Sequence, residues 1–546
     1  MSEQTCLLLI KVSMMVKKQI VYSFDLAVFL FIAIILFSKL VTVSLSHDEQ
    51  QFVAPAELLV SHGWLPYADY PYLHTPYMVF INILPVLLPF PHFFAIRIFN
   101  AVFLLLGAII LYFETIKIIQ QQNVLGTRLL ATTVIFIYMF NPVMGSSNGW
   151  ALNHAAPMLF SLIALCWFLD VKRRQNISTL QTWVIATGVL ISISAFTRLT
   201  YAALLPVFLI GFIVFPAQSM RNRFYATANF LGGIVIGALP ALYLFFRAPW
   251  HFFYGNFVYI RLNTLYQSAL SFNNTLSLSA KISYFLSDVF LAPSGLLLYA
   301  ASCVCLLAGI RYFFRQKDAQ HFSLLFISIC CITMLITAFA PTPIWSKYFL
   351  APLPFMAICL SHLVNQITKN LKSQMPLYGI SILLLLTIAS PLYRTAAGLS
   401  ILNEPANWTP LQIHNLAEQI KERLKTSTAG GKVLTLGPVL PLDAGTDVFE
   451  IFAVGPFSWR TSLLLSPEYR QRYGVVSPDE LQNYLKNTPP TAILTGIEAD
   501  FAGFEKSEYG GLENPFIEYA QTHHYRAIRL PLFSNITTNQ LILWVP

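Results

Sequence analysis

The sequence predicts a polytopic α-helical membrane protein, with about eleven transmembrane helices followed by a small soluble α/β domain. Hydrophobic residues make up 56% of the 546 residues and charged residues only 11%, a balance that excludes an ordinary soluble globule. Long apolar runs recur up to about residue 400, and short strand and helix patterns alternate after it. We therefore divide the chain into a membrane region, 1–400, and a soluble region, 401–546.

The charge of the two regions differs in sign. Residues 1–400 contain 23 basic and 10 acidic residues, whereas residues 401–546 contain 11 basic and 15 acidic ones. The basic excess therefore belongs to loops between membrane helices, where Lys and Arg gather on the cytoplasmic side. It does not indicate a nucleic-acid groove, and we expect no nucleic-acid partner.

The first apolar run covers about residues 21–45. It is long enough to cross a bilayer and lacks a small-residue cleavage pattern, so we expect a retained helix and not a signal peptide. Lys11, Lys17 and Lys18 precede this run and predict a cytoplasmic N-terminus.

Ten further spans are predicted, and together they give one consistent orientation. They are 94–118, 128–144, 155–171, 181–197, 199–216, 224–246, 289–310, 321–340, 348–364 and 376–393. This assignment puts 15 of the 23 basic residues of the membrane region in the cytoplasm and the soluble region outside it. We expect an integral protein of a bacterial inner membrane.

Two external regions, 46–93 and 247–288, are unusually long for connections in a packed bundle. Within the first, residues 76–90 are apolar but contain Pro85 and Pro89 and are too short for a full crossing, so they predict an interfacial or re-entrant helix. The alternative is a short span, which would place every later basic loop on the wrong side.

Asp48 and Glu49 adjoin the outer end of the first helix, in a membrane region that has few acidic residues. A carboxylate at such a boundary is a candidate functional group, and burial would raise its pKa toward that of a general base. We predict that both residues are catalytic, although neighbouring residues on a helix point about 100° apart and only one is expected to face the substrate. The alternative is that they cap the following helix.

Cations on the outer side could stabilise a lipid-linked phosphate as it leaves. Arg198, at a tight turn, and Lys347 are candidates, with an interfacial side chain that reaches toward water as the alternative for each. Arg261, in the second external region, is the preferred phosphate ligand because a guanidinium binds phosphate oxygens in bidentate fashion.

Tyr72 and His74 are candidates for contacts with the substrate, and a structural histidine is an equal alternative for His74. His47 beside Asp48 and Glu49 offers ligands for a divalent metal, but no second cluster completes the set. We therefore assign no metal site and no cofactor.

The soluble region predicts strands at 432–436, 491–495 and 540–545, with helices at 411–424 and 478–486. It contains no glycine-rich phosphate fingerprint, so we predict no nucleotide site there.

The chain resembles the GT-C superfamily of membrane glycosyltransferases, and among them the bacterial relatives of protein O-mannosyltransferases and aminoarabinose transferases. The residues that carry this resemblance are Asp48-Glu49, Tyr70–Pro76, Thr197-Arg198 and Tyr348 through Pro354. The resemblance implies an inverting transferase that uses a polyprenyl-phosphate sugar on the non-cytoplasmic side, with the first acidic residue as base or acceptor-orienting group. Leu73-His74-Thr75-Pro76 departs from the His-Pro-Pro followed by Gly-Lys of the mannosyltransferases, which leaves the sugar and the acceptor open.

Three other functions compete with this hypothesis. A surface-polysaccharide ligase or polymerase would share the lipid-linked donor, but a more basic external loop would be expected. A transporter of lipid-linked sugars usually has ionisable residues in mid-membrane and repeat symmetry, which this chain lacks. A membrane scaffold would not need the acidic pair.

Overall fold

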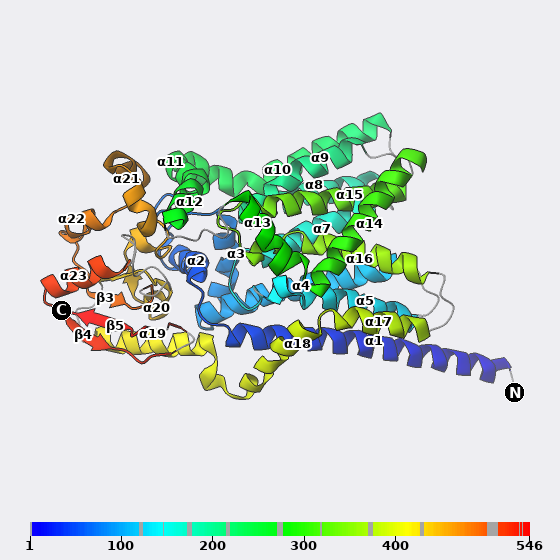
Figure 1. Cartoon of the computed structure of the whole chain (residues 1–546), viewed down its shortest axis with the longest axis horizontal. Coiled ribbons are helices and arrows are strands. Elements are labelled where there is room, and N and C mark those ends of the chain that lie inside the picture. The colour runs from blue at the N-terminus through cyan, green and yellow to red at the C-terminus, as the bar shows by residue number, and fades with distance from the viewer. Residues whose placement is uncertain are drawn as a thin grey trace.

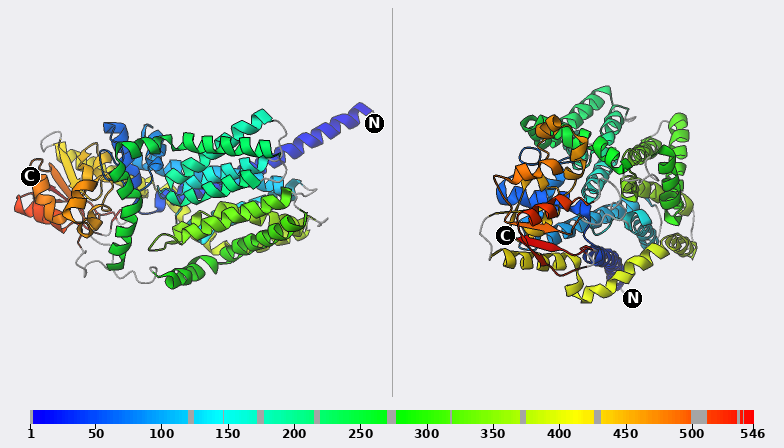
Figure 2. Two further views of the ribbon diagram at one scale, coloured as in Figure 1. Left: turned by 90° about the horizontal axis from the view of Figure 1, so that it is seen from above. Right: turned by 60° about the vertical axis from the view of Figure 1, so that its left-hand side comes forward.

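The computed structural model describes residues 3–119, 124–145, 147–171, 177–214, 219–269, 277–316, 319–369, 375–425, 431–498, 511–533, 536–537 and 539–546. A bundle of long helices forms one end of the molecule and a small β-sheet with short helices forms the other (Figure 1). The N-terminal part of α1 projects from the bundle at the end away from the sheet (Figure 2).

Each predicted span coincides with a helix. These helices are α1 (Glu3–Thr42), α4 (His92–Ile118), α5 (Val124–Met139), α7 (Ala155–Val171), α8 (Ile177–Thr197), α9 (Leu204–Val214), α10 (Met220–Arg247), α14 (Pro293–Gln316), α15 (Ala319–Ala338), α16 (Leu353–Thr368) and α17 (Met375–Leu386). Among the described residues, five helices, α1, α4, α10, α14 and α15, are long and apolar enough to cross a membrane by themselves. The number of eleven crossings stays a prediction.

Shorter elements connect these helices. They are η1 (His47–Glu49), α2 (Gln50–His62), α3 (Tyr77–Val86), α6 (Pro142–Gly145), η2 (Leu199–Ala203), α11 (Pro249–Phe253), η3 (Tyr254–Val258), α12 (Tyr259–Ala269), α13 (Leu278–Tyr284), η5 (Phe285–Phe290), η6 (Ser346–Leu350), α18 (Ala389–Ala396), η7 (Ala397–Asn403) and η8 (Pro405–Asn407). The predicted short helix of residues 76–90 is α3, which has only ten residues and so is about half as long as a bilayer crossing requires. Helices α2, α3, α11 and α12 of these two regions lie at the end of the bundle that faces the C-terminal part (Figure 1).

Helices α8 and α10 approach each other closely because glycines face one another. A Cβ added at Gly233 would lie 2.1 Å from the carbonyl oxygen of Ile185, and one added at Gly188 would lie 2.3 Å from that of Phe230. Small residues let helix backbones come this near. The resulting van der Waals contacts hold helices together in lipid, where the hydrophobic effect does not drive their association.

The C-terminal part contains a mixed five-stranded sheet in the order β2-β1-β3-β5-β4. The strands are β1 (Lys432–Thr435), β2 (Asp447–Val448), β3 (Ala492–Thr495), β4 (Arg526–Arg529) and β5 (Ile542–Val545). β1 runs parallel to β2 and β3, whereas β5 pairs antiparallel with β3 and β4. The three strands predicted from the sequence are confirmed as β1, β3 and β5; β2, of two residues, and β4 were missed.

Helices cover the two faces of this sheet. They are α19 (Thr409–Lys425), α20 (Val439–Asp443), α22 (Leu481–Leu485) and α23 (Asn514–Thr522), with the short turns η9 (Glu450–Phe452), η10 (Trp459–Leu464) and η11 (Pro478–Glu480) nearby. Helix α21 (Pro467–Tyr473) lies away from the sheet, beside α11. Successive strand residues point to opposite faces, so Val433 and Leu543 pack in one core and Leu434 and Trp544 in the other.

One of these cores continues into the helical bundle. Val53 of α2 and Phe93 and Ile96 of α4 belong to the same buried cluster as Ile413 and Leu416 of α19. A second cluster joins the aromatic run of the first external region to the C-terminal part, through Tyr67, Tyr70, Tyr72, Val454, Phe457 and Tyr473. Burial of apolar surface on this scale holds the C-terminal part against the end of the bundle.

The contact between α8 and α10 can be tested with two adjacent glycines. Gly233→Ala should lower the unfolding free energy by about 1–3 kcal/mol, because the added methyl group meets the backbone of α8. Gly232→Ala is the matched control, since a Cβ there has no atom within 4 Å. Thermal unfolding of the two purified variants in detergent measures the difference, and equal stability would disprove the close contact.

Candidate active site

A cavity of about 990 Å³ opens where the bundle meets the C-terminal part. Its wall is built from segments that lie far apart in the sequence, in both the bundle and the C-terminal part. The ionisable and polar residues in it include His47, Asp48, His74, Asn153, His154, Arg198, Tyr259, Asn263, Lys347, Arg460 and Glu498. Of the predicted site residues, the structure therefore brings together Asp48, His74, Arg198 and Lys347.

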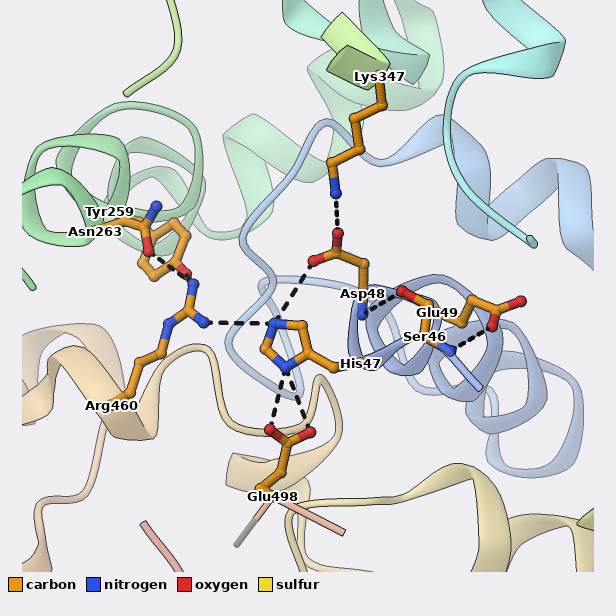
Figure 3. A network of polar contacts seen from close by, with 9 residues as sticks. All are labelled: Ser46, His47, Asp48, Glu49, Tyr259, Asn263, Lys347, Arg460 and Glu498. Carbon is orange, nitrogen blue, oxygen red and sulfur yellow. Dashed lines mark hydrogen bonds and ion pairs between the residues drawn. The ribbon is translucent and has the colours of Figure 1, made fainter. Parts of the chain in front are cut away.

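A short capped turn holds Asp48 at the end of α1. The Ser46 side chain accepts a hydrogen bond from the Asp48 backbone N–H at 3.3 Å, and the Glu49 carboxylate accepts one from the Ser46 N–H at 2.9 Å. This capping box fixes the 3-10 turn η1. The Asp48 side chain consequently points into the cavity, and that of Glu49 points away from it (Figure 3).

Glu49 does not line the cavity, contrary to the expectation that it serves catalysis together with Asp48. Its carboxylate is 0% exposed and receives two hydrogen bonds from the Arg97 guanidinium, at 2.8 and 2.7 Å. The other N–H groups of Arg97 bind the carbonyl oxygens of Leu40, Val43 and Ser44. Burial and this many donors are typical of a carboxylate that holds the structure together, and its partner Arg97 lies in the apolar run of α4.

The same carboxylate also positions the loop that precedes α7. Glu49 accepts a hydrogen bond from the Ala151 N–H at 2.7 Å, and two residues later Asn153 accepts one from Arg198 at 2.8 Å. The Arg198 guanidinium also lies 3.3 Å from the Nε2 atom of His154 and over the ring of Tyr348. Arg198 is thus held at the cavity wall by neutral groups.

Lys347 forms an ion pair with Asp48 across the cavity wall (Figure 3). Burial by itself would raise the pKa of Asp48, but the charges of Lys347 and His47 outweigh burial and bring that pKa below its usual value. The sequence had predicted the opposite direction. The carboxylate is therefore ionised and held by a cation.

Two residues of the C-terminal part complete the site from the opposite side. Glu498 approaches the Nδ1 atom of His47 at 3.1 Å, and the Nε2 atom of the same ring lies 3.7 Å from Asp48 (Figure 3). Arg460 of η10 lies 3.5 Å from that Nε2 atom and donates hydrogen bonds to the Tyr259 hydroxyl at 3.1 Å and to Asn263 at 2.7 Å.

His74 faces the cavity as an uncharged ring. Burial and the neighbouring charge of Arg198 lower the pKa of His74 to about 4, so the imidazole is neutral at physiological pH. A neutral imidazole can donate or accept a hydrogen bond with a sugar hydroxyl. Its ring packs near that of Phe52, with centroids 5.1 Å apart.

Arg261 and Tyr72, two other predicted substrate contacts, lie elsewhere. Arg261 is exposed and does not line the cavity, because α12 turns Tyr259 and Asn263 toward it instead. Tyr72 is 1% exposed and packs edge to face against Tyr67, outside the cavity lining. Within the part of the chain that the structure describes, no group of three or more His, Cys, Asp or Glu residues is arranged to hold a metal ion.

Comparison with known proteins finds solved structures with a similar fold. No family model and no curated protein matches the sequence. Among solved structures, ArnT from Cupriavidus metallidurans, bound to undecaprenyl phosphate, is 12% identical; the match covers 95% of this chain and 97% of that chain, with a TM-score of 0.59. The oligosaccharyltransferase AglB from Archaeoglobus fulgidus, in complex with an inhibitory peptide and a dolichol-phosphate, is 12% identical, with 96% and 76% coverage and a TM-score of 0.51.

The chain has the GT-C fold.

Several residues in and around the cavity were not predicted from the sequence. Arg97 carried a signal, since an arginine inside an apolar span requires a buried partner. Arg460 and Glu498 carried none, because each reaches the cavity only through the docking of the C-terminal part. Asn153 and His154 carried a signal too, because a polar pair directly before the apolar run of α7 indicates a polar surface at that end of the helix.

The distinct roles of the two neighbouring carboxylates can be tested by stability measurements. Glu49→Gln should lower the unfolding free energy by about 3–5 kcal/mol, because it leaves the fully buried Arg97 without its counter-charge. Asp48→Asn should change stability far less, since the Asp48 carboxylate is partly exposed at the cavity wall. Thermal unfolding in detergent compares the two, and an equal loss would contradict the structural role of Glu49.

Proposed function

We propose that this protein is a glycosyltransferase that moves a sugar from a polyprenyl-phosphate donor to an acceptor of the cell envelope, with inversion at the anomeric carbon. The observation that carries the proposal is the pairing of Asp48 with Lys347, beside Arg198, in the cavity of a GT-C fold. The donor class is supported by the structural neighbours, one solved with undecaprenyl phosphate and the other with dolichol-phosphate.

On the donor side, Lys347 and Arg198 would bind the phosphate that links lipid and sugar. Arg198 offers a planar set of donors and Lys347 a compact charge, and both already face the cavity. When the phosphate takes Lys347 as its partner, Asp48 loses part of the charge that lowers its pKa. Donor binding would therefore make Asp48 a stronger base, before the acceptor reacts.

The chemical step follows from this arrangement. Asp48 takes the proton of an acceptor hydroxyl or amine, whose oxygen or nitrogen forms a bond to the anomeric carbon. The bond from that carbon to the phosphate oxygen breaks on the opposite side, and its electron pair goes to the lipid phosphate. Lys347 and Arg198 stabilise the added negative charge in a partly dry cavity.

The membrane arrangement belongs to the same proposal. The N-terminus lies in the cytoplasm, and residues 401–546 form a domain on the extracytoplasmic face of a bacterial inner membrane. The distribution of Lys and Arg supports this orientation. The donor lipid then reaches the cavity from the bilayer, and the acceptor comes from the periplasmic side.

Asp48→Asn should abolish transfer, because the amide cannot take a proton from the acceptor. We expect a loss of at least about a hundredfold, as for removal of a general base. Comparing the masses of envelope glycans and lipids in cells that carry the wild-type gene, the variant or no gene measures this. Insertion and yield should stay normal, and full activity of the variant would refute the catalytic assignment.

Arg198→Gln should weaken the binding of undecaprenyl phosphate by about tenfold or more, since a charge-assisted hydrogen bond to phosphate is lost. Calorimetric titration of the purified protein in nanodiscs measures the affinity. Arg261→Gln is the matched control, because Arg261 is exposed and away from the cavity. An equal effect of both variants would count against a donor site at Arg198.

A further inference from the structure

Arg460 is a cation whose position the proposed donor site does not explain. It belongs to η10 in the C-terminal part, and its guanidinium reaches into the cavity between Tyr259 and His47 (Figure 3). The rings of Phe457 and Tyr266 lie 4.6 and 5.4 Å from the guanidinium carbon. The group is therefore enclosed by aromatic rings and kept away from bulk water.

No carboxylate of the described residues lies within ion-pair distance of Arg460. Among the described residues, its guanidinium donates hydrogen bonds to the Tyr259 hydroxyl and the Asn263 amide oxygen and lies 3.5 Å from the Nε2 atom of His47, and its Nε atom is buried with no hydrogen-bond partner there. A buried charge is costly unless an opposite charge and hydrogen bonds compensate it. The side chains that the structure describes supply only part of that compensation.

The charged side chains of the cavity are only partly paired with one another. Lys347 pairs with Asp48, and Glu498 faces His47. Within the described part of the chain, the guanidinium groups of Arg198 and Arg460 then remain at the cavity wall without a carboxylate partner. The lipid phosphate of the donor accounts for Arg198, so Arg460 is available for a second negative charge.

The position of Arg460 indicates which substrate brings this charge. Arg460 and Asp48 approach the same Nε2 atom of His47, at 3.5 and 3.7 Å, so an anion at Arg460 lies beside the proposed base. Arg460 enters the cavity from the C-terminal part, opposite to the bundle that admits the lipid. The Asn263 amide and the Tyr259 hydroxyl, which accept from Arg460, each carry hydrogens that could be donated to the same anion.

We propose that Arg460 binds an anionic group, a carboxylate or a phosphate, of the acceptor substrate, and that the acceptor is therefore an acidic glycan or a phosphorylated envelope molecule. This inference rests on the proposed function. Binding of the anion would hold the attacking hydroxyl or amine next to Asp48 and would select against neutral acceptors.

The test uses the full chain in nanodiscs loaded with undecaprenyl phosphate, so that the proposed donor site is occupied. Glucose 6-phosphate, glucuronate and glucose are titrated into it by calorimetry. The wild type should bind at least one of the two anionic sugars at least about tenfold more tightly than glucose. Arg460→Gln should abolish this preference, Arg460→Lys should retain part of it, and Arg526→Gln, at an exposed position of β4, should leave it unchanged.

Separate outcomes overturn the inference and the proposed function. Equal binding of all three sugars by the wild type, or a preference that persists in Arg460→Gln, would refute an anion site at Arg460. A loss of undecaprenyl phosphate affinity in Arg460→Gln as large as in Arg198→Gln would assign Arg460 to the donor instead. Absence of undecaprenyl phosphate binding in the wild type would refute the proposed donor, even where anion binding at Arg460 holds.

Discussion

The buried ion pair of Glu49 and Arg97 is the constraint on which the rest of the site depends. Arg97 ties the last carbonyl groups of α1 to α4, while Glu49 ties the turn at Ser46 to the loop at Ala151. Asp48 is the next residue to Glu49, and Arg198 rests on Asn153 of that loop. One pair of opposite charges, both 0% exposed, therefore sets the positions of the proposed base and of a proposed phosphate ligand.

The cavity is complete only when the C-terminal part is docked. The hydrophobic core that runs from α19 into α2 and α4, and the aromatic cluster beside it, fix the orientation of η10 and of the segment after β3. These two elements supply Arg460 and Glu498. A network that joins charges from both parts of the chain gains strength from its low-dielectric surroundings, but only while every member has its partner. Docking of the C-terminal part and assembly of the site are thus a single structural event.

The sequence predicted the helices and pointed to Asp48, which lines the cavity, because apolar runs and a rare acidic residue are local signals; the catalytic role of Asp48 stays a prediction. The sequence could not predict features that depend on a distant partner. The different positions of Asp48 and Glu49 follow from the pairing of Glu49 with Arg97, a contact that the sequence alone does not reveal. Arg261 lies away from the cavity for a different reason. That segment forms helix α12, in which Tyr259, Asn263 and Tyr266 follow the spacing of one helix face and line the cavity, whereas Arg261 lies about 200° from Tyr259 around the axis. Helical periodicity within the loop was the signal to use.

The direction of the Asp48 pKa shift connects the geometry to the order of events. A base that was merely buried would bind a proton before any substrate arrived, since burial disfavours its charged form. Here the charge of Lys347 keeps Asp48 ionised while the donor is absent. A donor phosphate that draws Lys347 toward itself would remove the charge that opposes burial. The pKa of Asp48 would then rise while the donor is bound. In the proposed reaction, the ion pair of Asp48 with Lys347 would weaken the base until the donor binds, and activation of the base would depend on the donor.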